Sequence, residues 1–97
     1  MIQIEAQDIH VGETKRIVLT PTDETGAAVT LQAVSVYLYR PDGTLASTLG
    51  LTDFTASGGK YTASLSFDTP GTWRVRVEAT DQLNNTEIEE NQLVVLP

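Results

Sequence analysis

The strongest constraint on the fold is a regular alternation of apolar and polar side chains after the Pro70–Gly71 turn signal. The apolar positions are Trp73, Val75, Val77 and Ala79, and the positions between them are Arg74, Arg76 and Glu78. Successive side chains of a β-strand point to opposite faces, so one face packs on a core and the other meets water or a partner. The segment therefore predicts a central strand of an antiparallel sheet, and it carries no motif of an active site.

Six further segments have the composition of strands and are separated by turn signals. They are residues 1–6, 15–20, 29–39, 45–51, 61–67 and 87–96, with 45–51 expected at a sheet edge. Turns or loops are expected at 8–12, 21–26, 57–60 and 84–85, and a type I turn at 40–43, where Pro41 presets φ. The apolar phase changes between Ile88 and Leu93, which predicts a β-bulge near Glu89 and Glu90.

No segment of ten or more residues has helical periodicity, so the expected fold class is all-β, an antiparallel β-sandwich of about seven to eight strands. The 97 residues are enough for one domain, spanning residues 1–97. A hydrophobic content of 40 % is sufficient for a core and too high for a disordered chain. The absence of cysteine excludes a disulfide, a thiolate metal site and a thiol nucleophile.

The charge balance limits the possible partners. A net charge of −7 argues against nucleic acid, because phosphate binding requires clustered Lys and Arg, and against an anionic membrane surface. The first residues have neither a basic nor a long apolar region, so no secretory signal is expected, and no run is long enough to span a bilayer. A complete gene product of this kind would be synthesised and kept in the cytoplasm.

The core is expected to form from the inward positions of the alternating strands. The expected anchors are Ile17, Leu19, Val36, Leu38, Phe67, Trp73, Val75 and Val77. Trp73 shares the phase of Val75 and Val77, which favours a core anchor or a corner hydrogen-bond donor over an exposed sugar-stacking platform.

The order of turn motifs resembles that of bacterial and bacteriophage immunoglobulin-like domains. The matching motifs are Gly12-Glu-Thr14, Asp23-Glu-Thr-Gly26, Pro41-Asp-Gly43 and Gly71-Thr-Trp-Arg-Val-Arg-Val-Glu-Ala-Thr-Asp81. The resemblance covers nearly the whole chain and implies an immunoglobulin-like β-sandwich. It is much less specific for function, since the family includes adhesin modules, glycosidase accessory domains and phage virion proteins.

Comparison with antibody domains assigns several of these residues to structural positions. Trp73 takes the place of the tyrosine in the corner before the sixth strand, and Val75 takes the place of the second cysteine. Either Ile17 or Leu19 would take the first cysteine position, so an apolar pair would replace the disulfide. No tryptophan lies on the third strand, so antibody-type recognition is not implied.

Two tyrosines and two arginines form the candidate partner-binding surface. Strands three and six are neighbours in an immunoglobulin-like sandwich, which places Tyr37, Tyr39, Arg74 and Arg76 on one outer face. Tyr and Arg are enriched in interface hot spots. The alternative is that Tyr–Arg stacking only covers a solvated sheet.

Other polar residues have simpler structural explanations, and no catalytic, metal-binding or cofactor-binding residue is expected. The oxygen ligands that could suit Ca²⁺ follow no calcium-loop spacing and are typical turn formers: Asp23, Glu24, Asp81, Asn84 and Asn85. The glutamates at 87, 89 and 90 suit a charged edge strand that resists edge-to-edge pairing. His10 has no partner at a catalytic spacing.

The function expected from these features is a non-enzymatic structural or interaction protein. The resemblance favours a bacteriophage virion component, such as a capsid decoration or neck/tail accessory protein, located in the virion. It would dock through a sheet face or edge on other virion proteins or on copies of itself. The alternative is a binding or spacer module of a larger secreted bacterial protein, with carbohydrate as a conceivable ligand.

Overall fold

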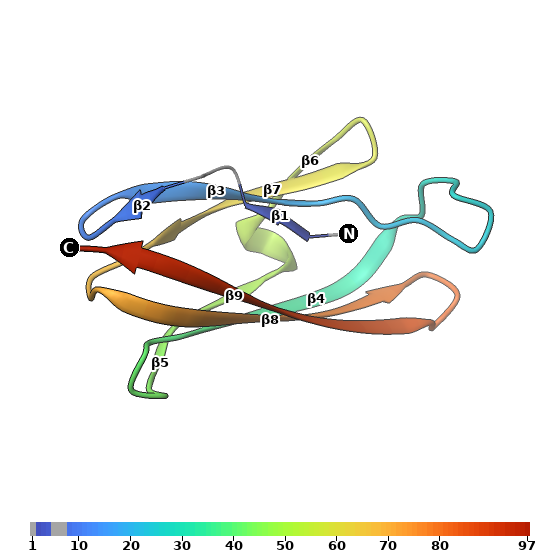
Figure 1. Cartoon of the computed structure of the whole chain (residues 1–97). Helices are drawn as coiled ribbons and strands as arrows, with labels where there is room; N and C mark the ends of the chain where they lie inside the picture. Colours follow the sequence, from blue (N-terminus) through green and yellow to red (C-terminus); the bar gives the residue numbers. More distant parts are fainter. Residues whose placement is uncertain (1, 5–7) are drawn as a thin grey trace.

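Two facing β-sheets make up the computed structural model, which describes residues 2–4 and 8–97 (Figure 1). The first sheet has the order β1-β3-β7-β6 and the second the order β2-β9-β8-β4-β5. The strands of the first sheet are β1 (Ile2–Ile4), β3 (Thr14–Leu19), β7 (Lys60–Ser66) and β6 (Thr55–Ser57). Those of the second are β2 (Ile9–His10), β9 (Thr86–Leu96), β8 (Gly71–Asp81), β4 (Leu31–Tyr39) and β5 (Leu45–Gly50).

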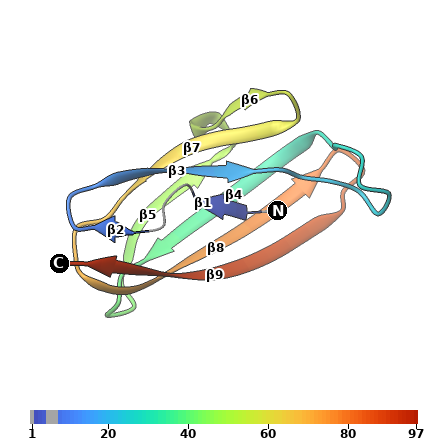
Figure 2. The same ribbon diagram turned by 45° about the horizontal axis from the view of Figure 1, so that its top comes forward.

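All strand pairs are antiparallel except that between β2 and β9, which is parallel. The two layers enclose the core between them, and a 3₁₀ turn, Leu51–Asp53, connects β5 to β6 (Figure 2). The predicted all-β immunoglobulin-like sandwich without a disulfide is thereby confirmed. The described strands number nine, because β2 lies within a segment predicted as a turn and β6 within the stretch 52–57, which was not predicted as a strand.

The core consists of the inward positions of both sheets. Each of the eight residues expected as core anchors is at most 1 % exposed. The Trp73 ring meets Phe67 edge to face, with centroids 5.2 Å apart and planes at 80°. Val75 and Ile17 belong to the same buried cluster, so an apolar cluster occupies the region where the antibody comparison places a disulfide.

Apart from the segment 8–12, which contains β2, turns form where the sequence predicted them. Gly43 donates its N–H to the carbonyl of Arg40 at 2.9 Å, and Asp42 accepts hydrogen bonds from the backbone and the hydroxyl of Thr44. Asn84 adopts a positive φ of 66° in the hairpin that joins β8 to β9. The short polar side chains thus provide the local hydrogen bonds that each reversal of the chain needs.

The predicted bulge near Glu89 and Glu90 is wrong. β9 pairs with β8 in unbroken register from Thr86 to Val95. The apolar phase changes because Ile88 points to the outer face, where it is 55 % exposed, whereas Leu93 points inward opposite Trp73. The register shifts of this sheet lie on β4 instead, between Leu31 and Ala33 and between Leu38 and Tyr39. Of the strand predicted over 1–6, residues 1, 5 and 6 lie outside the described residues.

Candidate partner-binding surface

The candidate surface is the outer face of the second sheet, centred on β4 and β8. Val36 and Leu38 of β4 point inward, so Tyr37 and Tyr39 between them point outward. The register places Tyr37 directly opposite Arg76 and Tyr39 directly opposite Arg74. The four residues proposed from the sequence therefore lie together as two cross-strand pairs.

Arg74 and Tyr39 form a cation–π pair. The guanidinium carbon of Arg74 lies 4.7 Å from the centroid of the Tyr39 ring. Arg74 is exposed and forms no ion pair within the described part of the chain. Its positive charge is therefore open to a partner, while its planar head covers one face of the tyrosine.

Arg76 is held differently. Its Nε donates to Glu78 at 3.2 Å, and its Nη1 donates to Glu90 of β9 at 3.2 Å. These hydrogen bonds, first that to Glu78 and then that to Glu90, raise the pKa of Arg76 above its ordinary value. Arg76 thus fastens β8 to β9 and contributes less net charge to the surface than its neighbour Arg74.

Exposed apolar side chains extend this surface on both sides. Leu45 of β5 lies opposite Tyr39, Ile88 opposite Glu78, and Val94 opposite Thr72. They are 49, 55 and 62 % exposed, respectively. These residues were not predicted as part of the surface, although unbroken alternation along β9, without the assumed bulge, places Ile88 and Val94 outward. Apolar side chains beside Tyr and Arg are typical of interface patches.

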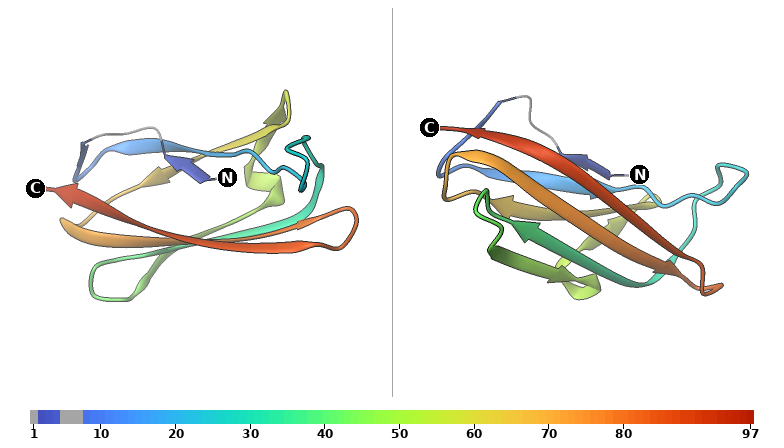
Figure 3. Two further views of the ribbon diagram at one scale, coloured as in Figure 1. Left: turned by 45° about the vertical axis from the view of Figure 1, so that its right-hand side comes forward. Right: turned by 60° about the horizontal axis from the view of Figure 1, so that its bottom comes forward.

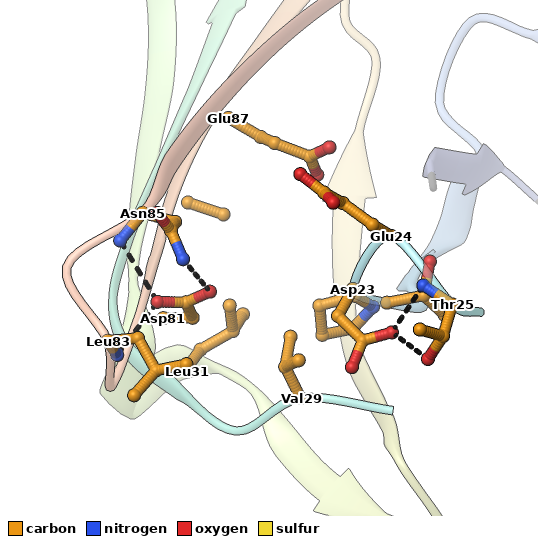
Figure 4. Close-up of a pocket in the computed structure, with 12 residues that line it drawn as sticks. Asp23, Glu24, Thr25, Val29, Leu31, Asp81, Leu83, Asn85 and Glu87 are labelled. Carbon is orange, nitrogen blue, oxygen red and sulfur yellow. Dashed lines mark hydrogen bonds between the residues drawn. The ribbon is translucent and has the colours of Figure 1, made fainter. Parts of the chain in front are cut away.

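A pocket lies at one end of the sandwich, between the 21–30 loop and the β8–β9 hairpin (Figure 4). The pocket measures about 610 Å³; Val29, Leu31 and Leu83 supply apolar lining, and Glu24 and Glu87 point toward one another across it.

Both aspartates of this pocket are occupied by turn hydrogen bonds. Asp81 accepts from the backbone N–H groups of Leu83 and Asn85, and Asp23 accepts from the backbone and hydroxyl of Thr25. The hydrogen bonds lower the pKa of Asp81, chiefly through Asn85, and that of Asp23, chiefly through the Thr25 hydroxyl. Within residues 2–4 and 8–97 no three His, Cys, Asp or Glu side chains are grouped to hold a metal ion.

Two remaining features of the described residues bear on function. The ring of exposed His10 lies 3.3 Å from Glu13, and its backbone N–H also donates to this carboxylate, so the pair closes a local turn. No helix in the described ranges has the length and apolarity needed to cross a bilayer.

The fold and this surface define a small immunoglobulin-like β-sandwich domain with a polar-aromatic patch on one outer sheet face. A family model described as YtkA-like matches residues 2–78, so the chain belongs to the YtkA-like family. A search of curated proteins gave no significant sequence match.

Solved structures with the same fold include modules of large bacterial proteins. In the multi-modular, cell-surface-expressed chitinase ChiW of Paenibacillus sp. str. FPU-7, the match covers 96 % of this chain and 8 % of ChiW, at 11 % identity and a TM-score of 0.64. For the fibronectin(III)-like modules of Clostridium thermocellum CbhA, it covers 99 % of this chain and 97 % of the module, at 15 % identity and a TM-score of 0.57.

CopC from Methylosinus trichosporium OB3b has a similar fold as well. The match covers 100 % of this chain and 95 % of CopC, at 11 % identity and a TM-score of 0.64. At these identities, the likeness to all three structures establishes the fold alone.

Proposed function

We propose that this chain is a non-enzymatic binding or spacer module of a larger bacterial protein, and that it docks on a protein partner through the outer face of β5, β4, β8 and β9. The observation that carries the proposal is the pairing of Tyr37 with Arg76 and of Tyr39 with Arg74 on an exposed face. Similar folds in ChiW and CbhA, which are parts of modular bacterial proteins, support the module role.

A virion role finds less support. The bacteriophage expectation rested on turn motifs that immunoglobulin-like domains of many proteins share. The structural relatives described above are bacterial, and none of their names refers to a phage. A module of a bacterial protein is therefore the better supported of the two functions expected from the sequence.

The Tyr39–Arg74 pair favours a protein partner over a carbohydrate. A sugar ring stacks on an open aromatic face, and one face of Tyr39 is covered by the Arg74 guanidinium at 4.7 Å. A protein partner, in contrast, can pair a carboxylate with Arg74 in place and pack apolar side chains against the exposed Leu45 and Val94.

A site-specific photocrosslinker at Thr48 tests this surface, because Thr48 lies opposite Tyr37 on β5. The labelled domain is incubated with extract of its native cells, and the same crosslinker at Ser57, on β6 of the other sheet, serves as the control. We expect one crosslinked product from Thr48 that excess unlabelled wild-type domain abolishes. Excess domain carrying Arg74→Glu should not compete.

Lys60→Glu provides the matched competitor, since it makes the same change of charge at the start of β7, on the other sheet, and should compete like wild type. Equal products from Thr48 and Ser57, or full competition by Arg74→Glu, would show that this face is not the docking surface. Pelleting of the domain with insoluble chitin or cellulose, lost on Tyr37→Ala, would instead favour carbohydrate binding.

A further inference from the structure

One flank of the second sheet is an open strand edge. β9 is 11 residues long, but β2 pairs only with Val95 and Leu96 at its end. Among the described residues, the stretch from Thr86 to Glu90 has β8 on one side and no strand on the other. β9 runs along this border of the molecule (Figure 3). The unpaired N–H and C=O groups of such an edge can pair with a further strand.

The side chains along this edge are acidic. Glu87, Glu89 and Glu90 lie within five residues, and residues 81–97 contain no Lys or Arg. Glu90 is engaged by Arg76, whereas Glu87 and Glu89 form no ion pair with the described residues. Glu87 is exposed and Glu89 half-buried, so both carboxylates remain within reach of an incoming strand.

This charge pattern argues against a second copy of the chain as the occupant. Two β9 edges that pair with each other would bring their glutamates together, between molecules that each carry a net charge of −7. Like charges on neighbouring strands are destabilising. The edge glutamates therefore protect against self-association. The unpaired backbone N–H and C=O groups of the edge stay available to a strand of the opposite charge.

We propose that the Thr86–Glu90 edge of β9 binds an extended, basic segment of a partner protein, which adds to the second sheet as a sixth strand. Backbone hydrogen bonds to the free edge hold the segment, and Lys or Arg side chains at alternate positions pair with Glu87 and Glu89. This edge is distinct from the surface formed by Tyr37, Tyr39, Arg74 and Arg76. A negative result for one of the two proposed sites therefore does not decide the other.

Synthetic nine-residue peptides provide the probe. One peptide alternates Lys with Thr and Val; a second has the same sequence with N-methylated Thr and Val residues, which keeps the charge but removes backbone donors; a third replaces Lys by Glu. We expect the first peptide to slow hydrogen exchange of amides in Thr86–Glu90 and to shift their NMR signals. The N-methylated and acidic peptides should do neither.

Charge-neutral variants of the intact domain test the partner's chemistry. Glu87→Gln combined with Glu89→Gln should weaken the first peptide about tenfold at low salt, given two lost cross-strand charge pairs. Asp8→Asn, which removes an exposed carboxylate outside the Thr86–Glu90 edge, should bind like wild type. Equal binding of the N-methylated peptide, or protection outside β9, would overturn strand addition. If the double variant binds the first peptide as tightly as wild type does, the proposal that the partner segment is basic is wrong.

Discussion

The indole Nε1 of Trp73 donates a hydrogen bond of 2.8 Å to the backbone carbonyl of Thr69. Trp73 is itself fully buried, so this bond ties the turn before β8 to the centre of the core. The chain thereby uses an indole where the antibody comparison places a tyrosine, and the corner is fixed without a disulfide.

Trp73→Phe should lower the free energy of unfolding by about 1–3 kcal/mol, since the smaller ring leaves a cavity and cannot donate to Thr69. Urea denaturation followed by far-UV circular dichroism measures the change, because the variant has no tryptophan to report by fluorescence. A midpoint equal to that of wild type would contradict the proposed anchoring of the turn.

Gly71→Ala should also destabilise the domain. Gly71 has a φ of +128°, and a Cβ at this position would lie 2.7 Å from Cγ of Pro41. Gly43→Ala is the matched control, because Gly43 has a φ of +89° but nothing within 4 Å of a built Cβ. Backbone strain should cost each variant about 1–3 kcal/mol, and the clash should make Gly71→Ala the less stable in urea denaturation. Equal stability of the two variants would show that the turn can move away from the clash with Pro41 at no cost in free energy.

Tyr61→Phe should lower the free energy of unfolding by about 1–3 kcal/mol. The Tyr61 hydroxyl on β7 accepts a buried hydrogen bond of 3.0 Å from the backbone N–H of Leu31 on β4, so it links the two sheets. Phenylalanine fills nearly the same volume but leaves that donor unpaired. Urea denaturation gives the free energy, and hydrogen exchange at Leu31 should become faster in the variant. Unchanged exchange at this amide would contradict the assigned bond.

Acid should weaken the fold. Hydrogen bonds lower the pKa values of five carboxyl groups, those of Glu13, Asp23, Asp42, Asp68 and Asp81. Their pKa values in the folded protein lie below those in the unfolded chain. At pH values between the two, the unfolded chain therefore binds more protons than the folded protein. The stabilisation is complete above the ordinary carboxyl pKa of about 4 and is lost as pH falls through the folded values.

The triple variant Asp23→Asn, Asp42→Asn and Asp81→Asn should flatten this pH dependence, because the amide oxygen still accepts the turn hydrogen bonds but no longer titrates. Urea midpoints between pH 7 and pH 3 provide the measurement. If the variant loses stability with acid as steeply as wild type, these turns do not account for the acid sensitivity.

Alternation alone predicted much of the fold and the candidate surface. The β8 pattern and its turn signals place Trp73 inward and Arg74 outward, since both depend only on the two-residue period of a strand. The same reasoning was wrong for β9, where an outward Ile88 was interpreted as a break in register. It also missed β2, because a two-residue strand carries no measurable period. Exposed apolar residues on an edge strand thus make its register difficult to predict from the spacing of apolar residues alone.

The parallel pairing of β2 with β9 has a mechanical consequence for a module placed between other domains. Ile9 lies opposite Val95 and His10 opposite Leu96, and the N–H of Val11 donates to the Leu96 carbonyl at 3.0 Å. Tension on the two ends of the chain pulls these strands along their length in opposite directions. The hydrogen bonds then bear the load together in shear and are not opened one after another.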